Sequence, residues 1–400
     1  MAAKKFARTL LLALTLGANL LFLTGCESGK AEKNTGANTS AAVWKPGVPI
    51  AVQNIKIGVL YFGNPGSETS GFSYEHHIGI RVMQKALGLT DAQIITETDV
   101  LDANASEIEY HLRKFVSMGA NLVFATTFGY MDACAKVAAE YPNVIFAHIS
   151  GYKGNDTNFT NYFGAIHQAR YLSGIVAGLR TKTGKIGYVA AKGTESSEVS
   201  NGLNAFAMGV ESVNPAARIY VIVTKNWFDP ASEALAARTL IRLGSDVISH
   251  HTDSPAPIME AQKAGVWAVG YHSDMRREAP ETVLTSAVWH WGVYYTSLVR
   301  SVINGTFTAK PYFGSMKDGL VGLAPLNEKL VAAGTDEAVE KTAARIRSGE
   351  FDVFDGVMET NDGRKIGRKG GRLSNLEIMR NVDWYYRNIV VAPFRPVESR

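Results

Sequence analysis

The fold class is decided first by residues 55–66, whose sequence reads IKIGVLYFGNPG. The first seven residues form a short run rich in β-branched side chains, and the run ends at Gly63, Pro65 and Gly66. A run of this length that is bounded by turn residues is typical of a buried strand. The residues that follow, 74–87, have the pattern of a helix. The sequence therefore predicts a strand that leads directly into a helix.

The same alternation of strand and helix continues to about residue 285. Further strand-like runs occupy residues 93–98, 122–126, 144–149, 186–190, 219–223, 247–248 and 266–270, and helical segments occupy residues 105–118, 132–140, 172–179, 199–213, 230–243 and 256–264. Alternation of this kind predicts βαβ units with parallel sheets. Because it comes in two series, near 54–165 and 168–285, we predict an α/β protein with two doubly wound parallel-sheet lobes.

The amino-acid composition argues against several other classes of protein. The chain has 400 residues, of which 46% are hydrophobic and 20% are charged, so it can bury a large core and is not disordered in bulk. Its net charge is +4, but three of its 41 Lys and Arg residues (Lys4, Lys5 and Arg8) lie in the first 25 residues. Without them 38 basic residues oppose 37 acidic ones, and this near-neutral balance gives no indication of nucleic-acid binding.

The N-terminus has the pattern of an export signal. The basic residues precede an apolar stretch at 9–23, which is too short for a comfortable membrane span. The stretch ends in Leu-Thr-Gly-Cys at residues 23–26, which resembles a bacterial lipobox. We predict a lipoprotein signal peptide at 1–25, and a lipidated Cys26 followed by a flexible tether to residue 53. A chance cysteine after an ordinary signal peptide is the alternative, and Cys134 is expected to be a small core residue without a disulfide partner.

Aromatic residues crowd the segments that follow the predicted strands. In open parallel sheets, ligands bind beyond the carboxyl ends of the strands. The rings in these segments are Phe72, Tyr74, Phe128, Tyr130, Tyr152, Trp227, Phe228 and Tyr271, and Trp289 and Trp291 follow later. Rings offer a large stacking area at low entropic cost, so the pattern predicts a cleft for a flat and weakly polar ligand. The alternative is that many of these rings belong to the core.

Motifs of catalysis and metal binding are missing from the sequence. It contains no phosphate-binding loop, no Gly-x-Gly-x-x-Gly after the first strand, no Gly-x-Ser-x-Gly elbow and no His-Glu-x-x-His. Adjacent histidines, as at 76–77 and 250–251, point apart on a helix or a strand. We therefore predict no catalytic residues, no metal site and no cofactor. The basic run at 365–372 follows the hairpin signal Asn-Asp-Gly, and we interpret it as a solvated turn rather than a nucleic-acid contact.

Several longer motifs in the sequence resemble those of a known protein family. They include GFSYEH at 71–76, TFGYMD at 127–132, HTDSPAP at 251–257, GYHSDM at 270–275 and LTSAVWHWG at 284–292. The chain resembles, over residues 54–392, the basic membrane protein (BMP) family of ABC-transporter substrate-binding lipoproteins. It is most similar to the subgroup thought to bind purine bases. The resemblance implies a type I periplasmic-binding fold, with a hinge between two lobes that close on a solute.

The resemblance also implies domain limits and site residues. Lobe one would comprise residues 54–166 and about 286–320, and lobe two residues 167–285 with parts of 321–400, the C-terminal tail serving as a buttress without a site role. Phe72 corresponds to the first stacking ring of the ligand site, beside Ser73 and Tyr74. The other residues implied as ligand contacts are Phe128, Tyr130, Trp227, Asp253, His272 and Trp289. Asp253 is suited to accept hydrogen bonds from the N–H groups of a purine.

Two departures from the family pattern bear on the ligand. His272 and the segment 289–291 stand where nucleoside-binding members carry an acidic residue and a lysine, which favours a bare base such as adenine or guanine. His77 replaces an aspartate, and His76, His77 and His272 together suggest an oxidised purine such as xanthine or urate. The expected function is therefore a membrane-anchored, extracytoplasmic solute-binding protein of an ABC importer, with permease subunits as partners. It would face the periplasm or the cell exterior. A nucleoside or another aromatic solute, and a sensor that signals to a membrane kinase, are the alternatives.

Overall fold

The computed structural model describes residues 44–394. The expected signal peptide at 1–25, Cys26 and residues 27–43 of the expected tether lie outside the described residues. The expectation of a flexible tether is wrong for residues 44–53, which pack on the first lobe: the Ile50 N–H donates a hydrogen bond to the Ile303 carbonyl at 3.1 Å, and a short helix spans Val52–Asn54. None of the helices in the described part is long and apolar enough to cross a membrane.

The first lobe is built on a parallel sheet. Its order is β11-β5-β4-β3-β1-β2, and every neighbouring pair runs parallel. The strands are β1 (Ile57–Leu60), β2 (Ile94–Glu97), β3 (Leu122–Ala125), β4 (Ile145–Ile149), β5 (Phe159–Gly164) and β11 (Tyr312–Gly314). The helices are α1 (Phe72–Leu87), α2 (Ala105–Ser117), α3 (Met131–Glu140) and α8 (Trp291–Ile303).

Both faces of this sheet are covered because its strands are apolar on both sides. Val59 of β1 and Phe124 of β3 pack into the core that includes α1 and α8. Their neighbours Leu60 and Val123 point the other way, into a separate core formed with α2 and α3. Alternation of side chains along a strand places successive residues on opposite faces, so β1 and β3 contribute to both cores.

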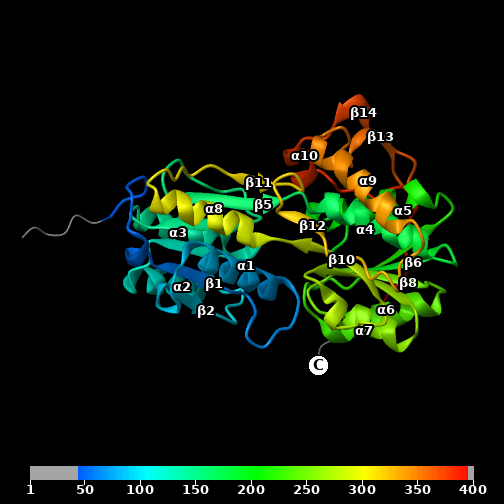
Figure 1. The fold of residues 1–400 in the computed structure, drawn as a ribbon, viewed down its shortest axis with the longest axis horizontal. Helices are drawn as coiled ribbons and strands as arrows, with labels where there is room; N and C mark the ends of the chain where they lie inside the picture. The colour runs from blue at the N-terminus through cyan, green and yellow to red at the C-terminus, as the bar shows by residue number, and fades with distance from the viewer. Residues whose placement is uncertain (1–43, 395–400) are drawn as a thin grey trace, which may run out of the picture. The chain divides into compact units, whose positions relative to one another are not determined.

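The second lobe repeats this topology. Its sheet has the order β12-β10-β9-β8-β6-β7-β15, in which only the edge strand β12 is antiparallel to its neighbour among the described residues. The strands are β6 (Lys185–Ala190), β7 (Arg218–Val223), β8 (Val247–His251), β9 (Trp267–His272), β10 (Val283–Trp289), β12 (Val321–Leu323) and β15 (Ile389–Val391). The helices are α4 (Ile166–Arg180), α5 (Ser197–Val213), α6 (Pro230–Arg242) and α7 (Ala256–Lys263). The prediction of an α/β protein with two parallel-sheet lobes is confirmed (Figure 1).

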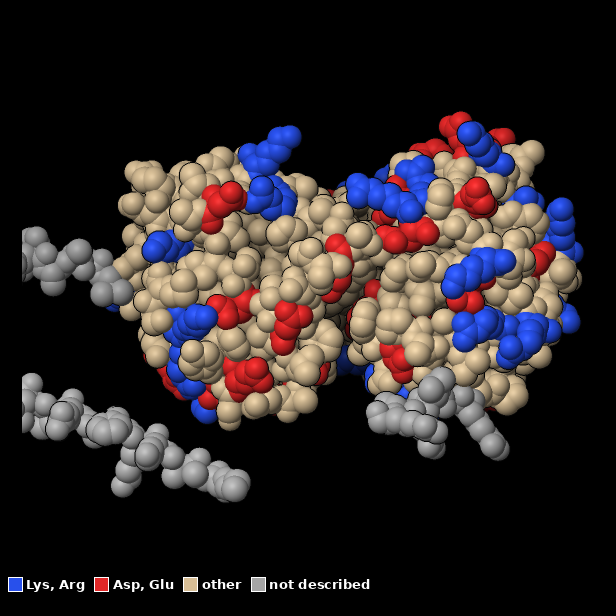
Figure 2. All heavy atoms as spheres, turned by 90° about the horizontal axis from the view of Figure 1, so that it is seen from below, with Lys and Arg blue, Asp and Glu red and all other residues tan. Residues whose placement is uncertain are grey.

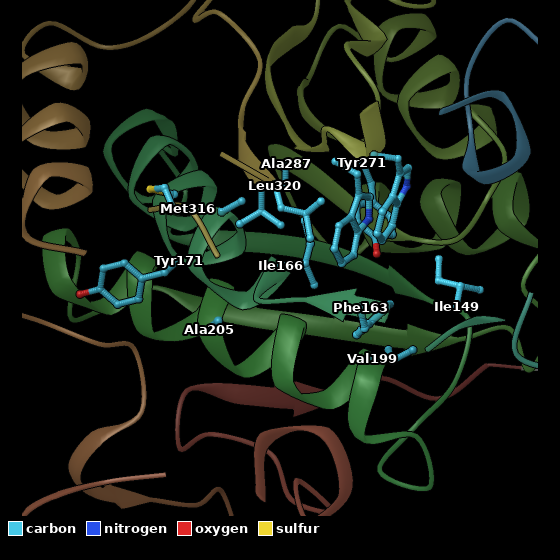
Figure 3. Close-up of a cluster of buried hydrophobic side chains, with 14 of the residues drawn as sticks. Ile149, Phe163, Ile166, Tyr171, Val199, Ala205, Tyr271, Ala287, Met316 and Leu320 are labelled. Atoms are coloured by element: carbon cyan, nitrogen blue, oxygen red, sulfur yellow. The ribbon is translucent and has the colours of Figure 1, made fainter. Parts of the chain in front are cut away.

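The chain passes between the lobes at three places in the described structure: from β5 to α4, from β10 to α8 and from β11 to β12. Backbone hydrogen bonds join these crossings: the Ala165 N–H donates to the Gly314 carbonyl at 2.8 Å, and the His290 N–H donates to the Leu320 carbonyl at 2.7 Å. Figure 3 shows Ile166, Ala287 and Leu320 packed together at this point, inside a hydrophobic core that continues into both lobes. The crossings are therefore tied into one connecting element.

The C-terminal segment packs on the second lobe. It contains α9 (Thr335–Ser348), the antiparallel hairpin of β13 (Asp355–Glu359) and β14 (Lys365–Arg372), and α10 (Asn375–Arg380). The Asn204 side chain on α5 donates a hydrogen bond to the Trp384 carbonyl at 2.8 Å, which holds this segment in place. The basic run at 365–372 is mostly exposed, but it is strand β14 and not a turn; the turn is formed by the preceding Asn-Asp-Gly. The prediction of a turn at the basic run was wrong because the hairpin signal came before it.

Candidate functional site

Two cavities lie where the carboxyl ends of the strands of the two lobes face each other. The larger cavity has a volume of about 720 Å³, and its walls include Phe128, Ser150, Tyr152, Phe163, Lys192, Glu195, Ser196, Ser197, Glu198, Asn201, Trp227, Met379 and Arg380. The smaller has a volume of about 370 Å³ and includes Phe62, Gly63, Asn64, Ser67, Glu68, Phe72, Ser73, Asp99, Leu101, Phe228 and Asp253. Figure 2 shows the groove between the two halves, with acidic side chains along its edges. Both volumes are in the range of small-molecule sites.

The structure divides the residues expected from the sequence into three groups. Phe128 and Trp227 line the larger cavity. Phe72, Ser73 and Asp253 line the smaller one. The remaining four, Tyr74, Tyr130, His272 and Trp289, are in the lining of neither cavity.

Tyr130 and Trp289 are core residues. The Tyr130 ring is fully buried in the core of the first lobe, and its hydroxyl donates a hydrogen bond to the Val100 carbonyl. Trp289 is 1% exposed and stacks on Trp291 with ring centroids 4.4 Å apart. The expectation that Tyr130 contacts a ligand is not met, because the short helix at Phe128–Tyr130 turns Phe128 toward the cavity and Tyr130 toward the sheet.

A buried histidine positions the loop that carries Phe128. The Nε2 atom of His148, at the end of β4, lies 2.8 Å from the Thr127 carbonyl oxygen and donates a hydrogen bond to it. Burial lowers the pKa of His148 to about 4, so the ring is neutral at physiological pH. Phe128 is 52% exposed and Tyr152 is 56% exposed, although both are large apolar rings. Exposed rings on the wall of a cavity are available to contact a ligand.

On the same lobe, α1 presents Phe72 and Ser73. The Ser73 hydroxyl accepts a hydrogen bond from the Gly63 N–H at 3.1 Å, which joins the start of α1 to the loop after β1. The Phe72 ring packs edge-on against His272 of the second lobe, with centroids 5.4 Å apart. This contact brings the two lobes together beside Asp253.

Asp253 is held by a histidine. Its Oδ1 atom lies 2.9 Å from Nε2 of His272, and its side chain is 16% exposed. Burial raises the pKa of Asp253 to about 7, and burial followed by the charge of Arg170 lowers the pKa of His272 well below its usual value. The neutral ring donates Nε2–H to Oδ1 of Asp253, and Nδ1 has no partner among the described residues. One carboxyl oxygen of Asp253 is thus engaged, and the other has no hydrogen-bond partner among the described residues.

Glu233 links the two loops of the second lobe that carry the cavity-lining residues Trp227 and Asp253. Its Oε2 atom accepts hydrogen bonds from the hydroxyls of Thr252 at 2.8 Å and Ser254 at 2.6 Å, the residues on either side of Asp253. Its Oε1 atom accepts a hydrogen bond from the Asp229 N–H at 2.8 Å, in the loop that carries Trp227. Glu233 is therefore a positioning residue. It was missed in the sequence because its role depends on partners about 20 residues away.

Further wall residues were also missed in the sequence. Glu198 lies in the first turn of α5, where burial followed by the charge of Asp253 raises its pKa to about 7. Met379 and Arg380 come from α10, and the Arg380 guanidinium lies over the Tyr152 ring of the first lobe, 4.9 Å from its centroid. The C-terminal segment therefore contributes to the cavity wall, contrary to the expectation that it has no site role. For Glu198 the available signal was its place after a strand, in the segment 192–199.

The histidines that suggested an oxidised purine do not line either cavity. His76 is fully buried, lies 2.6 Å from the Tyr295 hydroxyl and stacks on Trp291. Burial lowers the pKa of His76 and of His77. His76 and His272 are therefore neutral supports behind the cavity walls.

Backbone strain marks the rim of the cleft. Ser150 after β4 and His272 at the end of β9 have φ angles of 52° and 68°, in the left-handed region that L-residues rarely adopt. Strain of this kind costs about 1–3 kcal/mol for each residue and clusters at functional sites. Both positions lie at the carboxyl ends of strands, on the side of the sheets that faces the cleft.

Comparison with known proteins identifies relatives of this chain. A family model described as "ABC transporter substrate-binding protein PnrA-like" matches residues 56–353. A purine-binding protein of Brucella abortus is 36% identical over 343 residues, which cover 85% of this chain and 95% of that protein. A Haloferax volcanii protein, whose name describes a glucose-binding component of an ABC transporter, is 36% identical over 65% of this chain and 66% of its own length.

Solved structures share the fold. A solute-binding protein of an ABC transporter from Aeropyrum pernix matches with a TM-score of 0.63 at 19% sequence identity. The match covers 74% of this chain and 92% of that one. At this identity the likeness shows the fold alone, and it confirms the two-lobed periplasmic-binding arrangement.

Proposed function

The chain belongs to the Bmp family of PnrA-like ABC transporter substrate-binding proteins, and from this premise we propose that it binds a purine base between its two lobes. The bound form would then deliver the base to the permease subunits of an importer. The name of the Brucella relative, a purine-binding protein, supports this choice of solute.

The observation that carries the proposal is the larger cavity, which has aromatic walls on both lobes. Phe128 comes from the first lobe and Trp227 from the second, and both line the same volume of about 720 Å³. A flat ligand that stacks on rings from both lobes stabilises the closed arrangement, since only that arrangement brings the rings together. Each such stacking contact contributes about 0.5–1.5 kcal/mol beyond the burial of area.

The polar groups of the cleft favour a ligand that donates hydrogen bonds. Glu198 lines the larger cavity and Asp253 the smaller, and the Asp253 N–H donates a hydrogen bond to the Trp227 carbonyl at 2.8 Å. This hydrogen bond links the linings of the two cavities. Ring N–H and amino groups of a purine base suit carboxylate acceptors. We assign Phe72, Ser73 and Asp253 to the adjoining wall through which the lobes close on the base.

The anchor is also part of the proposal. A lipidated Cys26 would hold the protein at the outer face of the bacterial cell membrane, on a tether that starts at residue 27 and ends before the packed residues 44–54. A Cys26→Ser variant should then leave the detergent-rich phase in a phase-separation assay, while the wild-type protein stays in it. Equal partition of both forms would contradict the lipid anchor.

Thermal unfolding with a panel of solutes tests the ligand. The protein is first unfolded and refolded to remove bound solute, and then heated with adenine, guanine, hypoxanthine, xanthine, urate, adenosine, guanosine, riboflavin or glucose. A base at about 100 times its Kd adds about 2.7 kcal/mol to the free energy of unfolding, which raises Tm by several degrees. We expect this shift with a free base at micromolar concentration. A shift with glucose or with nucleosides alone would contradict the proposal.

A further inference from the structure

The larger cavity has an unpaired carboxyl group on its wall. Glu198 lines this cavity, and among residues 44–394 its carboxyl oxygens accept no hydrogen bond and take part in no ion pair. Desolvation and the neighbouring Asp253 both disfavour its ionised form. The Glu198 side chain is half-buried, so its carboxyl group lies on the wall without a protein partner and within reach of a ligand. Carboxyl groups with shifted pKa values are concentrated at functional sites.

A structural role in the helix does not account for Glu198. Glutamate in a first helical turn commonly accepts a hydrogen bond from the backbone, as Glu377 of α10 does from the Ser374 N–H at 2.7 Å. Glu198 lies in the first turn of α5, but no such bond reaches its carboxyl group. Its carboxyl group is therefore free for a partner that the protein does not supply.

The cationic side chains of the same cavity already have partners within the protein. The Lys192 ammonium donates a hydrogen bond to the Lys225 carbonyl at 2.7 Å, and Arg380 lies over the Tyr152 ring. Glu195, the other acid on this wall, accepts a hydrogen bond from the Gly193 N–H at 2.9 Å. Glu198 is thus distinct from the other charged residues of the wall.

We propose that Glu198 binds, through both carboxylate oxygens, a ligand edge that presents a ring N–H beside an exocyclic amino group, as guanine does. A carboxylate accepts two parallel N–H bonds when both of its oxygens are free, and this bidentate arrangement is strong and directional. Asp253 cannot offer it, because His272 occupies one of its oxygens. The assignment rests on the proposed binding of a purine base.

Glu198 would then set the choice between purines. The corresponding edge of adenine presents an acceptor nitrogen beside its amino group, and an ionised carboxylate repels the acceptor. Affinities are therefore compared at about pH 8.5, above the raised pKa of Glu198, where its carboxyl group is ionised. A side-chain amide offers one acceptor and one donor, which match that edge of adenine. Glu198→Gln should therefore change the preference and not merely weaken binding.

Calorimetric titration with guanine and with adenine tests this inference. Wild-type protein should bind guanine more tightly than adenine, and Glu198→Gln should lower the affinity for guanine about 10- to 100-fold while that for adenine is kept or increased. Glu198→Asp keeps the carboxylate and should keep the preference for guanine. Glu107→Gln is the matched control, since Glu107 also lies in the first turn of a helix but is exposed on α2.

The outcomes separate the two proposals. If wild-type protein binds purine bases and Glu198→Gln has the same ratio of guanine to adenine affinity, the role of Glu198 is overturned and purine binding stands. If wild-type protein binds adenine more tightly than guanine, the assigned edge is wrong. If it binds no purine base, the proposed function itself fails, and the assignment of Glu198 fails with it.

Discussion

A β-carbon added to Gly71 would lie 2.5 Å from the backbone carbonyl oxygen of Asp253, so the start of α1 and the loop after β8 approach each other through main-chain atoms. Gly71 also has a φ angle of 104°, which L-residues rarely adopt. The two residues belong to different lobes. Glycine at position 71 is therefore a condition for the close approach of the lobes beside Asp253.

Gly71→Ala should weaken solute binding, because the added methyl group holds the lobes apart. We expect a loss of about tenfold or more in affinity, measured by titration with the base that stabilises the protein. Gly88→Ala is the control, since Gly88 ends the same helix with a φ angle of 66° and has no atom within 4 Å of an added β-carbon. Equal affinity of both variants would show that the contact at Gly71 does not limit closure.

Glu233→Ala should disturb both ligand-facing loops of the second lobe. The change leaves the hydroxyls of Thr252 and Ser254 without their acceptor, and we expect a loss of about 1–3 kcal/mol in the free energy of unfolding. Solute affinity should fall in addition, and Glu233→Gln should restore part of it because the amide keeps one acceptor. Urea unfolding and ligand titration measure the two effects. An unchanged solute affinity in Glu233→Ala would show that Glu233 does not position these loops for binding.

The pH dependence of stability should carry a contribution from Glu198. Its pKa is raised from 4.5 to about 7, so the folded protein binds the proton more tightly than the unfolded chain does. The free energy of unfolding of the ligand-free protein should therefore fall as pH rises between those values, by at most about 1.4 kcal/mol per pH unit from this group. Glu198→Gln should remove this part of the slope.

Comparison of wild-type and Glu198→Gln protein separates the contribution of the Glu198 carboxyl group to this pH dependence from that of the buried histidines. Buried His76, His250 and His251 have lowered pKa values, so their effect has the opposite sign and appears as pH falls below about 6.5. They are present in both proteins and cancel in the difference. Identical slopes for wild-type and Glu198→Gln protein would mean that Glu198 ionises normally.

Arg380→Ala should speed the release of the solute. The guanidinium lies over Tyr152 of the first lobe and so joins the C-terminal segment to the opposite wall of the larger cavity. A contact of this kind contributes about 0.5–1 kcal/mol at an exposed site, which predicts a rise of about two- to fivefold in the dissociation rate. Stopped-flow release measures it, with Arg364→Ala on the exposed hairpin as control. A rate equal to that of the control would argue against a role in retention.

Most of the fold could be predicted because its strands are apolar runs. Among the strands that were not predicted, β5 and β10 lead into two of the crossings and have buried polar residues inside them. Thr160 of β5 donates a hydrogen bond to the Lys310 carbonyl, and Thr285 of β10 donates one to the Ala324 carbonyl. These hydrogen bonds to residues distant in sequence allow polar side chains to be buried in the core. The local sequence pattern does not indicate such partners, so the two strands could not be predicted from it.

Part of the site could be predicted from the rule that ligands bind beyond the carboxyl ends of parallel strands. That rule, with the family resemblance, indicated Phe128, Trp227 and Asp253, which the structure brings to the cavity walls. It does not distinguish a ring in the core, such as Tyr130, from its neighbour Phe128 on the wall. Arg380 escaped prediction because α10 reaches the cleft by long-range packing of the C-terminal segment on α5.

The most direct test of the account is calorimetric titration of the refolded protein with purine bases, in parallel with Phe128→Ala and Trp227→Ala. These two substitutions remove rings from opposite lobes that line one cavity. The account predicts that one base molecule binds per chain at micromolar or lower Kd, and that each substitution weakens binding by about tenfold or more. Binding that is absent from the wild-type protein, or that survives both substitutions unchanged, would contradict it.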